Sequence, residues 1–222
     1  MRSRRSALMW LSAITMAIGQ HSAIRAQAQA MPRLPVLEAA AEIMLDMSQA
    51  EVLETLRNGR MLADVITDLP PDGLTRMILA LPAEDDCLPR GAQFSCPNIR
   101  ISLVNDPQRG HRVMRVEAYQ PLEAAVPVAE VFRQVASAFG PPLQTMMAPE
   151  PVRGGNVTVW RQRWRDGIGD GPITEVLATQ QVSADAAFAN PMLPASGVGY
   201  LRVDPDIENE FLSVRRRLQS RQ

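Results

Sequence analysis

The stretch Pro127–Pro142 (PVAEVFRQVASAFGPP) constrains the fold more than any other part of this chain. Its apolar residues recur at spacings of three and four, so they line one side of a helix of about three turns, and that side has to be buried. Gly140 permits the backbone conformation that ends a helix, and Pro141 and Pro142 cannot continue one. We therefore expect an amphipathic helix that packs on other secondary structure and is followed by a strand.

Period-two alternation of apolar and polar residues predicts strands in much of the remaining chain. In the segment IRISLV, for example, Ile99, Ile101 and Leu103 alternate with polar residues. Turn signals rich in Pro and Gly separate several of these segments. The expected strands are residues 61–68, 74–81, 99–104, 112–119, 143–147, 157–165, 173–182 and 198–203.

Two further helices are expected before the first strand, at residues 36–46 and 49–57. The second follows Ser48, and Glu51 completes the spacing of a capping box, in which each side chain bonds the backbone N–H of the other residue. Asn58-Gly59 ends this helix. The C-terminal segment ENEFLSVRRRLQSRQ either extends the last strand or forms a short helix.

The two halves of the chain share one order of elements: a helix, a glycine, then three or four strands. From this order we predict an α+β fold in which helices pack on one face of an antiparallel sheet, built as two tandem modules. The modules would comprise residues 31–124, which hold a disulfide hairpin, and residues 125–222. A single continuous α+β domain is the alternative.

The N-terminus has the features of a secretory signal peptide, with three arginines in MRSRR and then an apolar run from Ala7 to Gly19. The run is too short to span about 30 Å of hydrocarbon comfortably. Small residues spaced A-x-A stand at Ala28 and Ala30, so we expect residues 1–30 to be cleaved off after Ala30, or after Ala28. An uncleaved anchor is the alternative. The cleaved product would be periplasmic or secreted, without stable membrane insertion.

Cleavage would make the protein acidic. It removes four arginines and no acid, so the 23 basic residues fall to 19 against 24 acidic ones, a net charge of about −5. A nucleic-acid-binding protein would instead need a basic face, so no nucleic-acid partner is expected.

Two cysteines, Cys87 and Cys96, lie close together in the segment DDCLPRGAQFSCPN. In an exported protein, which meets an oxidising compartment, an even count of two predicts one disulfide. A metal site would need further ligands nearby, and the spacing is too long for a redox C-x-x-C pair. We expect a structural disulfide that closes a short loop.

The sequence contains no recognisable catalytic constellation. One of its two histidines, His21, would leave with the signal peptide, and the other, His111, lies in the turn segment PQRGHR. No G-x-S-x-G motif supplies a serine nucleophile. We therefore expect a non-catalytic protein without a cofactor.

One acidic segment, DPDIENE, is a weak candidate for a metal site, because four carboxylates at period-two spacing would share one side of an extended chain. They are Asp204, Asp206, Glu208 and Glu210. Asn209 and Arg215 stand where an EF-hand loop needs Gly and Glu, so a solvated acidic edge is the favoured interpretation. The turn DGIGDG (residues 166–171) could also suggest a calcium or phosphate site, but we favour its interpretation as a plain hairpin turn.

The segment VTVWRQRWR carries the best candidate binding face. Trp160 and Trp164 lie on one side of the expected strand, and Arg161, Arg163 and Arg165 lie on the other. Exposed tryptophans would anchor a partner. In the alternative, both tryptophans pack beneath the helix expected in Pro127–Pro142. The arginines then face outward, where they can bond carboxylate or phosphate groups.

Between Val128 and Trp164, the chain combines a short amphipathic helix, the motif F-G-P-P and a strand with W-x-x-x-W. This order resembles exported bacterial proteins of the SmpA/OmlA type, small subunits of outer-membrane assembly machinery. It is also similar to the β-lactamase-inhibitory-protein fold, which repeats a helix-plus-sheet module twice. The chain lacks the lipid-attachment cysteine of the former and the binding residues of the latter. The resemblance implies a non-catalytic interaction or stabilising role.

Together these features predict an exported, non-catalytic protein that binds another protein or a cell-envelope component. One alternative is a cell-envelope hydrolase that acts through carboxylates, either Asp204–Glu210 or Glu84–Asp86. The other is a small-ligand carrier, which would need a closed apolar pocket.

Overall fold

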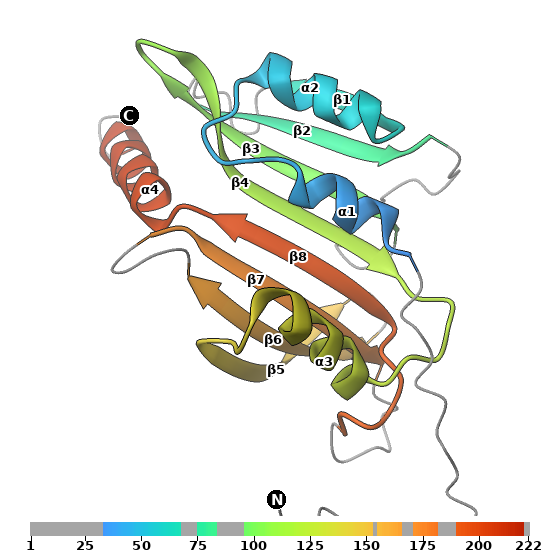
Figure 1. Ribbon diagram of the computed structural model, residues 1–222. Helices are drawn as coiled ribbons and strands as arrows, with labels where there is room; N and C mark the ends of the chain where they lie inside the picture. The colour runs from blue at the N-terminus through green and yellow to red at the C-terminus, as the bar shows by residue number, and fades with distance from the viewer. Residues whose placement is uncertain are drawn as a thin grey trace, which may run out of the picture. The chain divides into compact units, whose positions relative to one another are not determined.

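A computed structural model describes residues 33–67, 75–83, 96–152, 155–165, 171–181 and 190–219 of the chain (Figure 1). The expected signal peptide, Cys87, the acidic residues Glu84–Asp86 and residues 166–170 of the glycine-rich turn lie outside the described residues. The predictions made for these segments therefore stay predictions.

Eight strands and four helices make up the described chain. The strands are β1 (Met61–Thr67), β2 (Thr75–Pro82), β3 (Asn98–Asp106), β4 (Gly110–Pro121), β5 (Gln144–Val152), β6 (Gly155–Arg165), β7 (Ile173–Gln181) and β8 (Gly197–Val203). The helices are α1 (Pro35–Ala41), α2 (Gln49–Asn58), α3 (Val128–Phe139) and α4 (Pro205–Gln219). All neighbouring strands are antiparallel, and their order in the sheet is β1-β2-β3-β4-β8-β7-β6-β5.

The helix signals in the sequence are confirmed at α2 and α3. The Ser48 hydroxyl accepts a hydrogen bond from the Glu51 N–H at 3.3 Å, and the Glu51 carboxylate accepts one from the Ser48 N–H at 2.7 Å. Helix α3 ends at Gly140, whose φ of 78° is a left-handed conformation that glycine adopts without strain. The undecided C-terminal segment is helical, as α4.

The main hydrophobic core lies between one face of the sheet and three helices. Helix α1 packs on β3, β4 and β8, α2 on β1 and β4, and α3 on β6 and β7 (Figure 1). We call this side of the sheet the covered face. Its strand residues alternate with those of the opposite side, which we call the groove face. Fully buried side chains on the covered face include Ile78, Ile99, Ile101, Val116 and Val198.

The predicted fold of two tandem helix-plus-sheet modules is wrong. Strands β4 and β8 pair antiparallel from Arg115↔Val203 to Pro121↔Gly197, so the eight strands form one continuous sheet. Strands rather than helices dominate the fold. The main core is continuous as well, because one cluster of buried residues extends from Leu34 to Tyr200. A second, smaller cluster lies on the groove face and consists of Tyr119, Val157, Val159 and Leu177. The physical reason is the edge of β4, whose unpaired N–H and C=O groups would otherwise need other partners.

A β-bulge explains why the alternation in residues 112–119 is imperfect. The register between β3 and β4 shifts at Ser102 and Leu103, where Ser102 pairs with Arg115 and Leu103 pairs with Val113. The extra residue, Met114, is therefore unpaired, and both Val113 and Met114 are buried. A bulge of this kind inserts one residue and breaks the period of two.

Candidate functional site

A groove with a volume of about 470 Å³ lies on the groove face, across β4, β8, β7, β6 and β5. We call it the sheet groove. Ligand-binding clefts are typically about 300–1,000 Å³, so the sheet groove is large enough to receive side chains or a small molecule. Of the described helices, α4 reaches this groove, and its first turn forms one border through Pro205 and Glu208.

The floor of the sheet groove is apolar and comes from the central strands β7 and β8. Ile173 lies opposite Val203, and Leu177 lies opposite Gly199. Gly199 leaves room for Leu177, because a Cβ at this position would lie 2.7 Å from Cδ1 of Leu177. The Leu177 side chain therefore lies flat across β8 and is buried. Tyr200 and Leu201 of β8 also line the groove.

One wall of the groove is built on Arg115 of β4. Its guanidinium donates hydrogen bonds to Glu117 at 2.7 Å and to Glu208 of α4 at 2.8 Å. Burial disfavours the charge on Arg115, but the bonds and charges of the two glutamates outweigh that effect and raise the pKa of Arg115 above its ordinary value. The arginine therefore stays charged and ties α4 to the sheet.

Arg161 and Arg163 of β6 form the opposite wall, and they are held by the buried carboxylate of Glu175, which lies in β7 beside the floor residues. Its side chain is 6% exposed and accepts a hydrogen bond from Nε of Arg163 at 2.6 Å. Arg161 lies further away, with its Nε 3.9 Å from Glu175, and it also donates to Glu150 of β5. A carboxylate this buried requires charged partners, so Glu175 holds both arginines at the groove.

The charges in the lining of the sheet groove are balanced. Three arginines and three glutamates line the sheet groove, so its positive and negative charges balance. The groove is therefore not a nonspecific anion-binding site. Among the described residues that line it, there is no histidine, cysteine or serine that could act as a nucleophile or a base. An apolar floor between two ion-paired walls can instead bury an apolar group and bond polar groups of either sign beside it.

The structure divides the predicted binding face between the two sides of the sheet. Arg161 and Arg163 line the sheet groove, and Arg165 is exposed at the end of β6. Trp164 is buried on the covered face, where its Nε1 donates to the Gly140 carbonyl at 3.1 Å and its ring contacts Phe139 with centroids 5.4 Å apart. Trp160 is half-buried on the same face. These residues therefore do not form a single site.

The four candidate metal ligands belong to the start of α4. Asp204 caps this helix, because its Oδ1 accepts hydrogen bonds from the N–H groups of Asp206 at 3.0 Å and Ile207 at 3.2 Å. Glu208 is paired with Arg115. Helical rather than extended spacing separates the four carboxylates, and the described residues contain no cluster of acidic, His or Cys side chains that could hold a metal ion.

Sequence reasoning missed Arg115, Glu117 and Glu175. Glu175 gave a signal, since it is the sole charged residue in the strand ITEVLATQQ and lies directly opposite Arg163. Finding it required the register between β6 and β7. The roles of Arg115 and Glu117 could not be predicted from the sequence, because the wall they form depends on the contact of β4 with α4.

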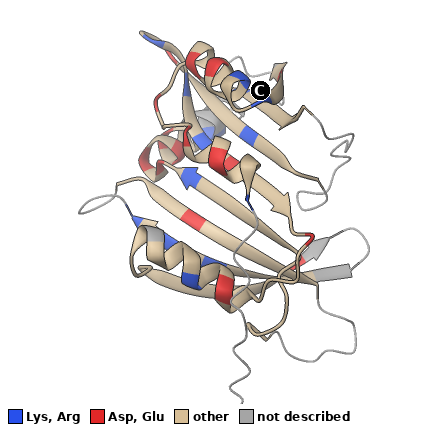
Figure 2. Ribbon diagram, turned by 45° about the vertical axis from the view of Figure 1, so that its right-hand side comes forward, with Lys and Arg blue, Asp and Glu red and all other residues tan. Residues whose placement is uncertain are grey.

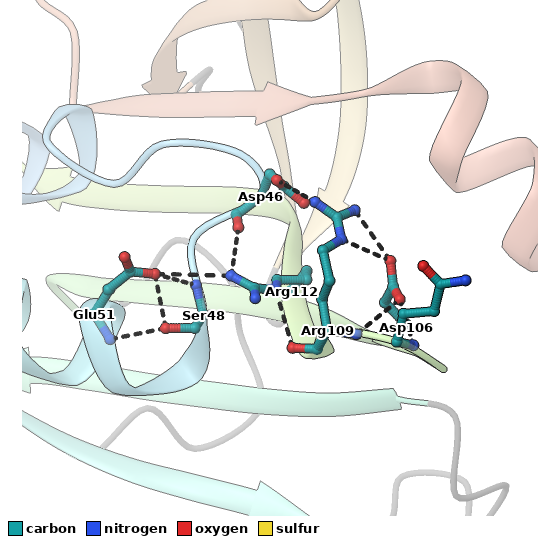
Figure 3. A network of polar contacts seen from close by, with 7 residues as sticks. Asp46, Ser48, Glu51, Asp106, Arg109 and Arg112 are labelled. Atoms are coloured by element: carbon teal, nitrogen blue, oxygen red, sulfur yellow. Dashed lines mark hydrogen bonds and ion pairs between the residues drawn. The ribbon is translucent and has the colours of Figure 1, made fainter.

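A separate polar network joins the segment after α1 to the β3–β4 hairpin (Figure 3). Arg109 bridges Asp46 at 2.7 Å and Asp106 at 3.0 Å. Arg112 donates to the Asp46 carbonyl at 3.3 Å, which supports the left-handed backbone of Asp46, with φ of 71°. A second cavity of about 420 Å³ lies beside this network and α4. The network positions the hairpin, so we assign it a structural role.

Two other predicted residues lie away from the sheet groove. His111 is half-buried at the start of β4, and its pKa is lowered by burial and by the charge of Arg76. Cys96 is buried, its carbonyl accepts a hydrogen bond from Asn98 at 2.6 Å, and no cysteine within the described ranges is free. Its pairing with Cys87 stays a prediction.

The chain matches no protein-family model, and no curated protein or solved structure is similar enough to count as a match. None of the helices in the described part of the chain has the length and apolar character needed to cross a membrane. The sheet groove is therefore interpreted from its own geometry.

Proposed function

We propose that this chain is an exported, non-catalytic protein that binds another protein or a cell-envelope component through the sheet groove. The observation that carries this proposal is the apolar floor of β7 and β8, which lies between two walls of paired arginine and glutamate side chains. Its partner would bury an apolar group on the floor and place polar groups against the walls.

Preorganisation of the arginines supports a binding role. Glu175 and Glu150 hold Arg161, and Glu117 and Glu208 hold Arg115, before any partner arrives. Ordering a long flexible side chain on binding costs about 0.5–1.5 kcal/mol, and a guanidinium already held in place avoids part of that cost. Such arginines also retain N–H groups that can bond a partner.

The charged lining favours this proposal over the small-ligand carrier, which would need a closed apolar pocket. It also favours a surface contact over carboxylate catalysis, because Glu117, Glu175 and Glu208 each accept hydrogen bonds from an arginine.

The test is capture of a partner from cell-envelope extract by the immobilised protein and two variants. Arg161→Ala/Arg163→Ala would leave the buried Glu175 without partners, so the groove variant also carries Glu175→Gln. Arg133→Ala, which removes an exposed ion pair with Glu130 on α3, is the matched control. We expect the wild type and the control to capture the same component and the groove variant to capture at least about tenfold less, a loss of 1.4 kcal/mol.

Circular dichroism should show that all three proteins are folded. Equal capture by the groove variant, or no component captured by the wild type, would contradict the proposed role of the groove. Export is tested separately: intact mass of the exported protein should show residues 1–30 removed, and their retention would contradict the signal-peptide prediction.

A further inference from the structure

The two outer strands of the sheet, β1 and β5, differ in their ability to accept another strand. Strand β5 contains Pro149 and Pro151. Proline has no N–H and is confined in sheets to positions that face away from the ladder, so the outer edge of β5 lacks two donors. Strand β1 contains no proline. The edge of β1 is therefore the one equipped for strand addition.

The hydrogen bonds at the start of β1 show which of its residues face that edge. The N–H of Ala83 donates to the carbonyl of Arg60 at 3.1 Å, so this pair, which directly precedes Met61↔Pro82, is hydrogen-bonded. Bonded and non-bonded pairs alternate in an antiparallel ladder. The residues whose N–H and C=O groups point away from β2 are therefore Met61, Ala63, Val65 and Thr67.

Side chains on the two faces of β1 specify what could lie beside it. On the covered face, Ala63 and Val65 are half-buried against the core next to α2. On the groove face, Leu62 is 63% exposed, Asp64 is exposed and Ile66 is half-buried. Within the described chain Asp64 forms no ion pair, and the residue opposite it on β2 is Leu79. A single carboxylate thus interrupts an apolar strip.

We propose that the edge of β1 binds an extended segment of a partner polypeptide as a ninth strand. The segment carries a Lys or Arg opposite Asp64 and apolar side chains two positions to either side, opposite Leu62 and Ile66. Main-chain bonds to the four outward residues supply the attachment, and the side-chain pattern supplies the selectivity. This surface is independent of the sheet groove.

Charge also selects a different chain over a second copy of this protein. In the registers that overlap most of the two strands, symmetric antiparallel pairing of β1 would place the two Asp64 carboxylates directly opposite each other or on a diagonal, about 7–8 Å apart. Like charges at these positions are destabilising. A basic residue in the added strand removes the repulsion and pairs with the carboxylate.

The first experiment measures amide exchange in the purified protein with a synthetic peptide as long as β1. The peptide has Lys at its centre and Ile and Leu two positions to either side. At saturation we expect exchange to slow at least about tenfold at the N–H groups of Met61, Ala63, Val65 and Thr67. The N–H groups of Leu62, Asp64 and Ile66 already bond β2 and should change little.

The second experiment exchanges the charges. A peptide with Glu in place of Lys should bind the wild type about two- to tenfold more weakly, and Asp64→Lys should reverse that preference. Ala63→Pro removes an outward N–H without breaking the β1–β2 ladder and should abolish binding of both peptides. Arg161→Ala, which alters the sheet groove alone, is the matched control and should bind the Lys peptide normally.

Several results would overturn the proposal. Protection of amides elsewhere, or equal binding of both peptides by the wild type and Asp64→Lys, would show that β1 is not the site. Concentration-dependent protection of the same four amides without peptide would identify a second copy as the occupant. If Ala63→Pro does not fold, the comparison of the Lys and Glu peptides with the wild type and Asp64→Lys alone tests the proposal. Loss of partner capture by the groove variant with intact peptide binding separates this proposal from the groove function.

Discussion

The covered face and the groove face belong to the same strands but differ in what stabilises them. In β7, Val176 and Ala178 face the helix layer and join the main core, whereas Glu175 and Leu177 face the sheet groove. Residues adjacent in sequence therefore serve different purposes. The covered face supplies most of the apolar burial, whereas the groove face combines a smaller buried apolar cluster with ion-paired arginines and glutamates. Figure 2 marks the acidic and basic positions along the strands. Strand β7 therefore contributes to two surfaces at once.

The largest expected effect is on the covered face. Ile101→Ala removes a fully buried side chain of the core, so we expect a loss of about 2–5 kcal/mol in the free energy of unfolding. Leu201→Ala on the half-buried groove floor is the matched control and should lose less than half as much. Urea unfolding measures both. Equal losses would show that the groove face is packed like a core.

A smaller effect is expected at the buried ion pair of the groove face. Arg163→Ala leaves the 6% exposed carboxylate of Glu175 without its nearest partner, and we expect a loss of about 2–3 kcal/mol in unfolding free energy. Adding Glu175→Gln should recover part of this loss, because a neutral amide is less costly to bury than a charge. A double variant as unstable as the single one would mean that packing, not charge, sets the cost.

The next effect concerns the floor of the groove. Gly199→Ala would place a Cβ 2.7 Å from Leu177 and 3.1 Å from the Ala118 carbonyl, so the leucine has to move. We expect a loss of about 1–2 kcal/mol. Combining it with Leu177→Ala should destabilise less than the sum of the two single changes, and a thermal or urea double-mutant cycle measures the difference. Strict additivity would contradict the close contact.

The smallest effect lies on the outer surface of α3. Hydrogen bonds from Arg133 and Gln134 lower the pKa of Glu130 to about 2. Because the folded pKa lies below the unfolded one, this stabilisation is complete above about pH 4.5 and is lost as the pH falls toward 2. Carboxyl NMR titration should find the low pKa, and Arg133→Ala/Gln134→Ala should raise it. A titration midpoint near 4.5 in the wild type would contradict the contact.

Local structure could be predicted well because its causes are local. The capping box of α2, the end of α3 at Gly140 and most strands follow from residue spacings within a single segment. The pairing of β4 with β8 could not be predicted in this way. Its cause is the need to pair an edge, and the partner strand lies far along the chain.

The candidate site shows the same limit. The row of arginines in VTVWRQRWR indicated two groove residues, Arg161 and Arg163, from sequence alone. The tryptophans beside them serve the helix layer instead, because α3 packs on β6 and buries Trp164. Glu175, which fixes both arginines, becomes visible once the cross-strand register is known.

The pairing of β4 with β8 also sets the order in which the chain can fold. Strand β8 is the last of the eight strands along the chain, yet it lies in the middle of the sheet (Figure 1). Until residues 197–203 emerge and insert, the earlier strands can form two partial sheets with exposed inner edges at β4 and β7. Such long-range pairing slows folding and leaves these edges exposed to aggregation. Insertion of β8 covers both edges and so ends the period in which the chain can aggregate through them.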